Sequence, residues 1–270
     1  MTPGDTARDG QHSKIETVAD DLGIRVDQRG AGRTALVLHG GGGPASVFAF
    51  TDDLSQYFHV LTPTHPGFAD TMRPSYMSSV KDLARSYALL IERSGLQDVL
   101  VIGFSLGGWV AAEMAASNPN AIAGLVLVDA VGIEVPGQDV LDVFSIAPSD
   151  IASFSYHAPD RFRIDMAKLT QQQAATMRSN FAALAVYGRN QNMQDPELRG
   201  RLVSVELPAL VVWGESDRVV FPEYGRSYAT AFPNSRFELI PECGHSPQIE
   251  RPERVLELVQ EFNRGLGDGD

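Results

Sequence analysis

The chain has 270 residues, of which 43% are hydrophobic and 21% charged, so it can bury a large core without a disulfide or metal staple. Its net charge of −12 argues against nucleic acid and anionic membrane surfaces as partners, because both bind basic patches. The single cysteine, Cys243, cannot form an intramolecular disulfide, which favours a reducing, cytoplasmic location.

Along the chain, short apolar runs alternate with stretches of helical period, a pattern typical of βαβ units around a parallel sheet. The polar N-terminus lacks the apolar segment of a signal peptide, and we expect residues 1–14 to form a disordered tail. No run reaches the ~18 apolar residues of a membrane span. The predicted strands are residues 23–27, 35–39, 59–63, 99–103, 124–129, 209–213 and 236–240.

Several helix boundaries are marked by their capping residues. Ser79 with Asp82 three positions later predicts a capping box, and Gly95 predicts the end of the same helix. The last helix is predicted to begin at Pro252, because proline is favoured in a first helical turn.

A glycine run follows the second predicted strand, where residues 39–44 read H-G-G-G-G-P. Such a run lets backbone N–H groups approach a developing negative charge without a side chain in the way. A phosphate cradle is the other interpretation, but neither G-x-x-x-x-G-K-[ST] nor a helix-opening G-x-G-x-x-G is present. We therefore predict an oxyanion hole from the amides of Gly41 and Leu106, with Gly42 as the alternative to Gly41. His39 is expected to be structural.

The strongest motif is G-F-S-L-G at residues 103–107, which follows a predicted strand and precedes a predicted helix. In that context G-x-S-x-G is a nucleophile elbow, a strained turn that presents the serine above the sheet. Ser105 is therefore the predicted nucleophile.

A serine hydroxyl needs a base, and the base needs an orienting acid. Asp217 and His245 each follow a predicted strand, so both are expected at the sheet edge where Ser105 emerges. We predict His245 as the base and Asp217 as the acid. Asp129, at the end of the strand at residues 124–129, is the alternative acid.

Residues 133–200 break the alternation, because they contain no clear strand but do contain amphipathic stretches such as residues 171–187. Open parallel sheets bind ligands beyond the carboxyl ends of their strands. We therefore predict a helical lid over residues 133–200, inserted into a core of residues 15–132 and 201–265. Extra helices on a sheet face are the alternative.

Together these features resemble the α/β-hydrolase superfamily over about residues 23–262. T-H-P-G-F at residues 64–68 stands where members carry a D-x-P-G-x-G-like loop, and residues 244–252 are similar to their G-H-x-x-x-x-E-x-P motif. The resemblance implies an α/β-hydrolase fold, with a mostly parallel eight-stranded sheet, helices on both faces and a helical lid after strand six.

We expect a serine hydrolase that cleaves a carboxylic ester or lactone of a partly apolar small molecule through an acyl-enzyme. No cofactor is needed, and the histidine spacing predicts no metal site. One alternative is carbon–carbon bond hydrolysis, or lyase or cyclase chemistry, by the same triad. The H-G-G-G-G-P loop resembles carbon–carbon hydrolases, but Phe104 and Ser246 replace their usual Asn and Trp. Another alternative is a non-catalytic ligand-binding protein. The oligomeric state stays open, with a homodimer as one option.

Overall fold

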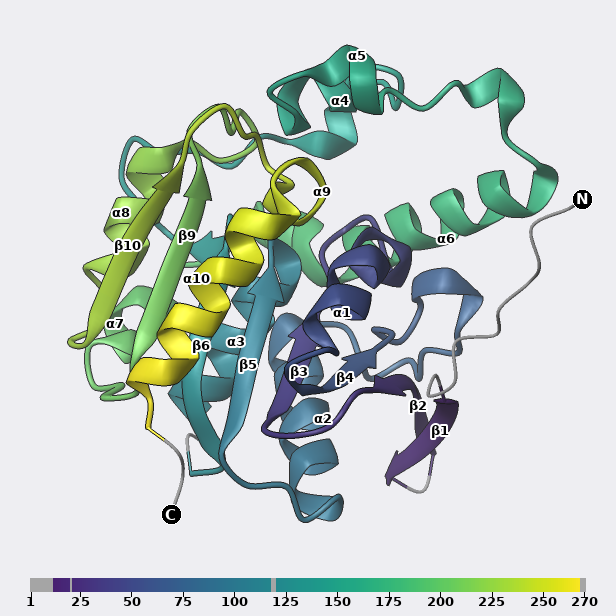
Figure 1. The fold of residues 1–270 in the computed structure, drawn as a ribbon. Helices are drawn as coiled ribbons and strands as arrows, with labels where there is room; N and C mark the ends of the chain where they lie inside the picture. The colour runs from purple at the N-terminus through teal and green to yellow at the C-terminus, as the bar shows by residue number, and fades with distance from the viewer. Residues whose placement is uncertain (1–11, 20, 118–119, 268–270) are drawn as a thin grey trace, which may run out of the picture.

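A mostly parallel sheet of eight strands forms the centre of the computed structural model, which describes residues 12–19, 21–117 and 120–267 (Figure 1). The strand order is β1-β2-β4-β3-β5-β6-β9-β10. The two pairings of β2 are antiparallel, and the other pairings in this sheet are parallel. The strands are β1 (His12–Ala19), β2 (Leu22–Arg29), β3 (Thr34–Leu38), β4 (His59–Pro63), β5 (Val99–Phe104), β6 (Ile122–Val128), β9 (Ala209–Gly214) and β10 (Ser235–Ile240). The predicted fold class is confirmed.

Helices cover both faces of the sheet (Figure 1). One face carries α1 (Phe48–Leu54) and α10 (Pro252–Gly265), and the other carries α2 (Val80–Arg93), α3 (Leu106–Ser117) and α8 (Pro222–Ala229). The short helix α9 (Pro247–Glu250) precedes α10. Of the helices in the described ranges, none combines the length and apolarity needed to cross a membrane.

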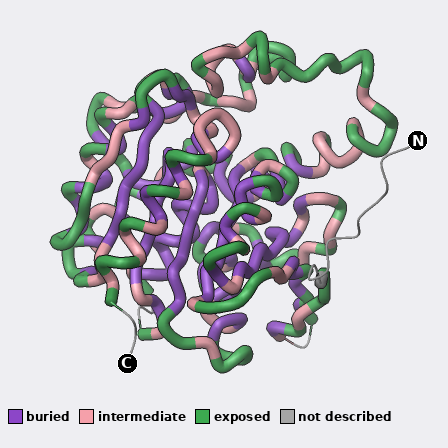
Figure 2. Tube along the Cα trace, viewed as in Figure 1, coloured by how far each residue is buried: buried purple, intermediate pink, exposed green. Residues whose placement is uncertain are grey.

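The two helical layers bury alternate side chains of each central strand. In β5, Leu100 and Ile102 enter the apolar cluster under α1 and α10, whereas Val99 and Val101 enter the cluster under α2 and α3. The central strands are buried along their length (Figure 2). Burial on both faces explains why these strands are apolar runs rather than alternating ones.

The predicted helix boundaries are confirmed. Ser79 caps α2 through the predicted capping box with Asp82, and Gly95 follows the helix with φ +63°. Pro252 begins α10.

The first strand is a correction to the prediction, because residues 12–14 belong to β1 rather than to a tail. The remaining tail positions, residues 1–11, lie outside the described residues. Among the described residues β1 pairs with β2 alone, at the sheet edge, where Ile15 is exposed and Val18 is buried. Such a half-polar edge strand does not stand out from a polar terminus.

The insertion between β6 and β9 begins and ends at one point. β7 (Gly132–Ile133) pairs in parallel with β8 (Gln194–Asp195), although no strand was predicted between residues 133 and 200. A two-residue strand is too short to leave a periodic signal. Between β7 and β8 lie α4 (Ile151–Ser155), α5 (Pro159–Phe162), α6 (Gln171–Gly188) and the single 3₁₀ turns Val143–Ser145, Met166–Lys168 and Arg189–Gln191. These helices lie over the carboxyl ends of the strands (Figure 1).

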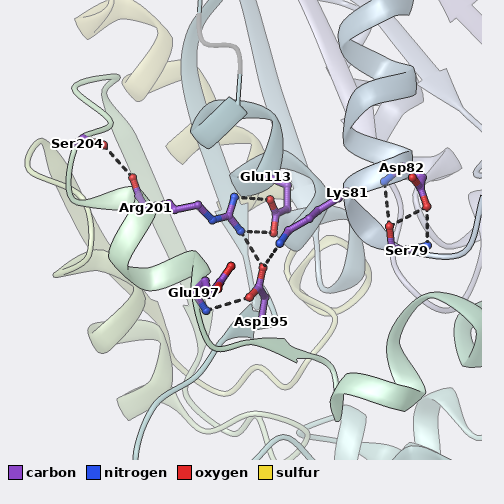
Figure 3. A network of polar contacts seen from close by, with 8 residues as sticks. All are labelled: Ser79, Lys81, Asp82, Glu113, Asp195, Glu197, Arg201 and Ser204. Carbon is purple, nitrogen blue, oxygen red and sulfur yellow. Dashed lines mark hydrogen bonds and ion pairs between the residues drawn. The ribbon is translucent and has the colours of Figure 1, made fainter.

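The end of the insertion is fixed by an ion-pair network (Figure 3). Arg201, in α7 (Leu198–Leu202), donates to both carboxylate oxygens of Glu113 on α3, at 2.7 and 2.8 Å. It also donates to Asp195 of β8 at 2.8 Å, and Lys81 of α2 pairs with the same carboxylate at 3.0 Å. The predicted boundary between residues 200 and 201 therefore falls inside α7, and the chain rejoins the core at β8.

Candidate active site

Ser105 lies in a sharp turn between β5 and α3, with a left-handed φ of +51°. The turn depends on the glycines beside it. A Cβ at Gly107 would lie 2.1 Å from the carbonyl oxygen of Leu38, and one at Gly103 would lie 2.3 Å from that of Gly107. Both contacts are with backbone atoms that cannot move aside. The strained serine and the flanking glycines together form the elbow that the motif predicts.

The structure brings the predicted nucleophile, base and acid together. Oγ of Ser105 lies 2.9 Å from Nε2 of His245, and Nδ1 of His245 lies 2.8 Å from Oδ2 of Asp217. His245 comes from the loop after β10, and Asp217 comes from the loop after β9. The Asp217 side chain is fully buried, the His245 side chain is 11% exposed, and Ser105 is half-buried. The serine is thus open to a substrate, while the bond between His245 and Asp217 behind it is shielded from solvent.

Asp217 is held in place by its own turn. Its Oδ1 accepts hydrogen bonds from the amides of Val219 and Val220, at 2.8 and 3.0 Å. These bonds leave Oδ2 to accept the Nδ1 proton of His245, which puts the other ring nitrogen toward the serine in its acceptor form. The Asp217 loop therefore fixes both the orientation and the tautomer of the imidazole.

The alternative acid, Asp129, lies close by but bonds elsewhere. Its Oδ1 accepts from the amide of Gly214 at 2.9 Å, and its buried Oδ2 has no partner among the described residues. Burial, together with the charge of Asp217, raises the pKa of Asp129 well above its ordinary value. A buried carboxyl beside an ionised one keeps its proton. The geometry favours Asp217 as the partner of His245.

The glycine loop lies directly against the nucleophile. A Cβ on Gly40 would come within 3.1 Å of the Cβ of Ser105, so the next residue, Gly41, borders the space above the hydroxyl. Leu106 is the first residue of α3, and the first N–H groups of a helix have no acceptor within the helix. The positions of Gly41 and Leu106 fit the predicted pair of oxyanion donors, which stays a prediction, as does Gly42.

His39 bonds the backbone of two loops, as expected for a structural residue. Its Nε2 accepts from the amide of His65 at 3.1 Å, and its Nδ1 donates to the carbonyl of Gly40 at 2.8 Å. His39 is therefore neutral. Burial, and then the neighbouring His65, lower the pKa of His39 well below its ordinary value.

His65 and Tyr87, whose bonds hold His39 in place, were not identified from the sequence. Nε2 of His65 donates to the carbonyl of His39 at 2.8 Å, and Nδ1 of His65 bonds the hydroxyl of Tyr87. Burial lowers the pKa of His65 to about 4, so this ring is also neutral near pH 7. The signal was present in the T-H-P-G-F motif at residues 64–68, but nothing local connects it to Tyr87.

The thiol of Cys243 and a group of possible metal ligands also lie near the site. Cys243 is buried, and burial raises the pKa of its thiol, so it is a poor nucleophile. One group among the described residues could offer three metal ligands, since atoms of Asp129, Asp217 and His245 lie within 4.8 Å of one another. Two of these residues bond each other, which suits proton transfer rather than a metal site.

Comparison with known proteins agrees with this geometry. The profile of the alpha/beta hydrolase family matches residues 35–258, which is most of the chain. The chain belongs to the alpha/beta hydrolase family.

Relatives of this alpha/beta hydrolase cover almost its whole length. It is 28% identical to a 2-hydroxymuconate semialdehyde hydrolase of Pseudomonas putida, over 92% of each chain. It is 27% identical to a 2-hydroxy-6-oxononadienedioate/2-hydroxy-6-oxononatrienedioate hydrolase of Paraburkholderia phymatum, over 97% of this chain and 99% of that one.

Solved structures show the same fold. A meta-cleavage product hydrolase of Pseudomonas fluorescens IP01 superposes with a TM-score of 0.80 at 20% identity, covering 95% of this alpha/beta hydrolase and 98% of that chain. A thermophilic esterase of Thermogutta terrifontis superposes with a TM-score of 0.74 at 25% identity, covering 96% and 99%. The shared architecture spans enzymes with different substrates, so it does not itself select one.

Proposed function

We propose that this chain is a serine hydrolase that cleaves the carbon–carbon bond beside a ketone in a small, partly apolar, conjugated substrate. The observation that carries the hydrolase assignment is the continuous path from Ser105 through His245 to Asp217, at 2.9 and 2.8 Å. The bond type is supported by the near full-length relatives, which are named as hydrolases of 2-hydroxy-6-oxononadienedioate and of 2-hydroxymuconate semialdehyde. This substrate replaces the ester or lactone expected from the sequence.

In the proposed reaction His245 takes the hydroxyl proton of Ser105 as Oγ attacks the ketone carbon. Asp217 stabilises the imidazolium that forms and keeps its ring oriented. The ketone oxygen becomes an oxyanion, and the amides of Gly41 and Leu106 donate to it. Loss of one such donor elsewhere costs on the order of 10²- to 10³-fold in rate.

Collapse of the tetrahedral intermediate breaks the bond between the former ketone carbon and its neighbour. The electron pair leaves on that neighbouring carbon, which needs conjugation to a second carbonyl to hold it. The imidazolium of His245 returns its proton to this carbon, and an acyl-enzyme remains on Ser105. A water molecule, deprotonated by His245, then releases the acid, so that one ketone and one water give a carboxylic acid and a C–H product.

Ester or lactone hydrolysis is the second candidate, and the side chain of Phe104 favours it. Phe104 stands where carbon–carbon hydrolases resembling this chain carry Asn, and here it packs on Phe50 inside the core, at 5.4 Å between ring centroids. It therefore offers no polar group to a conjugated acid. The steps at Ser105 would be the same, with an alkoxide as leaving group.

We also propose that the insertion acts as a lid. Asn180 of α6 donates to the carbonyl of Gly42 at 3.0 Å, and a Cβ on Gly41 would lie 2.8 Å from the Leu184 side chain. Helix α6 thus packs on the glycine loop at the mouth of the site, where it would contact a bound substrate. The single, buried Cys243 supports a reducing, cytoplasmic setting.

A comparison of kcat/KM for two substrates tests the proposal. Purified protein is assayed with 2-hydroxy-6-oxononadienedioate, whose 6-oxo group is a ketone, and with p-nitrophenyl butyrate, and is labelled with a fluorophosphonate. Labelling is expected in the wild type and in a Ser204→Ala control, and is expected to be lost in Ser105→Ala. A kcat/KM for the dienedioate above that for the ester supports carbon–carbon cleavage, and the reverse order supports the second candidate. Absence of labelling and turnover would instead indicate a non-catalytic binding protein.

A further inference from the structure

One segment of the insertion contacts both loops that carry the acid and the base. The backbone of residues 153–158, here termed the strap, runs from the end of α4 to the start of α5. The amide of His245 donates to the carbonyl of Ser155 at 2.7 Å. The amide of Arg218 donates to the carbonyl of Phe154 at 3.2 Å. The two amides belong to the catalytic base and to the residue after the predicted acid.

Glu250 fastens the strap to the histidine loop. Its carboxylate accepts the amide of Gly244 at 2.6 Å from one side. From the other side it accepts the strap amides of His157 at 3.1 Å and Ala158 at 3.3 Å. Hydrogen bonds to an ionised acceptor are about twice as strong as neutral ones. A single half-buried carboxylate therefore joins the residue before His245 to a segment about 90 positions away in the chain.

The acid loop has its own contacts with the strap. Nδ1 of His157 lies 2.8 Å from Oγ of Ser216, which directly precedes Asp217. The guanidinium of Arg218 donates to the carbonyl of Ser153 at 2.8 Å. Both neighbours of the acid are thus bonded to the same short segment.

The strap backbone lies so close to residue 244 that only glycine fits there. A Cβ there would lie 2.5 Å from the carbonyl oxygen of Ser155 and 2.7 Å from Cα of Tyr156. Its φ lies outside the left-handed region, so the requirement comes from the strap and not from the turn. By contrast, residues 163–168 of the insertion are exposed, and their ion pairs, Arg163 with Asp160 and Lys168 with Asp165, are local.

We propose that Glu250 is a positioning residue, which acts through the strap to hold the loops of His245 and Asp217 at bonding distance. This part of the insertion then stays docked on the loops that carry the acid and the base. The inference rests on the proposed function, because positioning has a meaning only if these residues react.

Glu250→Gln tests the proposal, with Glu253→Gln as the matched control. Glu253 is exposed on the first turn of α10 and loses the same charge in its variant. A glutamine side chain at position 250 cannot accept the three amides as a carboxylate does. We expect the fluorophosphonate labelling rate and kcat for p-nitrophenyl butyrate to fall about 10- to 100-fold, with KM unchanged, because small misplacements of reacting groups cost about that much. The control should match the wild type.

Amide hydrogen exchange, resolved by NMR, separates positioning from general stability. In Glu250→Gln the amide of Arg218 should exchange faster along with that of His157, although Glu250 does not contact Arg218. Unchanged exchange at Arg218 would overturn the role of the strap, and faster exchange with full activity would overturn positioning. If the variant does not fold, Ser216→Ala removes one strap contact and provides the same comparison. An unreactive wild type would refute the proposed function, while the exchange data would still decide the coupling.

Discussion

Asp129 and Asp217 bring carboxylate oxygens within 4.8 Å of each other, but only Asp217 bonds the imidazole of His245. Asp129 bonds the amide of Gly214 instead. The two residues follow neighbouring strands of the sheet, β6 and β9, and both side chains are buried. Burial is therefore common to both carboxylates, and the difference between them comes from the backbone amides that each loop supplies.

This arrangement predicts different outcomes for the two isosteric amides. Asp217→Asn should lower kcat for p-nitrophenyl butyrate by about 10⁴-fold, because an amide leaves the imidazole in the wrong tautomer. Asp129→Asn should keep kcat within a few-fold, since Asp129 bonds the amide of Gly214 and not the imidazole of His245. Steady-state assays on both variants, with near-ultraviolet circular dichroism as the folding control, provide the comparison. A larger loss in Asp129→Asn would transfer the acid role to that residue.

The buried histidine pair should make stability depend on pH. The pKa of His65 falls from an ordinary 6.5 to about 4 in the folded chain, and that of His39 is also lowered. The unfolded chain therefore binds more protons between these values, so stability is full above pH 6.5 and is lost as pH falls toward 4. The loss is about 1.4 kcal/mol per pH unit for each ring.

Urea unfolding of the wild type and of His65→Gln at pH 7.5, 5.5 and 4.5 measures this dependence. The glutamine cannot take up a proton, so the variant should lose less free energy of unfolding than the wild type over the same pH interval. Parallel pH curves for the two proteins would show that His65 is not responsible.

Glycine positions offer a pair of alanine substitutions with opposite signs. Gly107→Ala would place a Cβ 2.1 Å from the carbonyl oxygen of Leu38, so it should destabilise the chain by about 3 kcal/mol or more. Gly200→Ala adds a Cβ at an exposed position of α7 with nothing within 4 Å, and should stabilise the chain by about 0.5–1 kcal/mol. Thermal unfolding followed by circular dichroism measures both, and equal effects would contradict the packing of the elbow.

The ion pair between Arg201 and Glu113 should be costly to break from one side only. Glu113 has a side chain that is 1% exposed, so Arg201→Met would leave its charge buried and unpaired, at a cost of about 3–5 kcal/mol. Glu113→Gln added to Arg201→Met should restore much of that loss, because no uncompensated charge remains. Denaturant unfolding of the single and double variants tests this coupling, and additive losses would speak against it.

Local patterns were sufficient to predict the sheet apart from β1, the elbow and the loops that supply Ser105, Asp217 and His245. Each of these residues follows an apolar run, and runs buried on both faces are easy to recognise. The choice between Asp217 and Asp129 could not be made that way, because both follow a strand. It depends on the amides of Val219 and Val220, which turn one carboxylate toward the ring.

Long-range contacts account for most of what the sequence did not reveal. Three features join segments that only the fold brings together. They are the bond between His65 and Tyr87, the pairing of β7 with β8, and the contacts of the strap. Glu250 lies inside a motif that resembled the family, but its partners at residues 157 and 158 have no signature of their own. β1 was missed for a different reason, since an edge strand with one exposed face is polar enough to look like a tail.

The pairing of β7 with β8 has an evolutionary consequence. Because the two ends of the insertion lie side by side, the segment between β7 and β8 can be replaced, lengthened or shortened without disturbing the strands of the core. Such a graft would succeed only if the incoming piece still presented two backbone amides to the carboxylate at position 250. A chimera could therefore inherit a new substrate preference from its donor while retaining the hydrolytic machinery of its host.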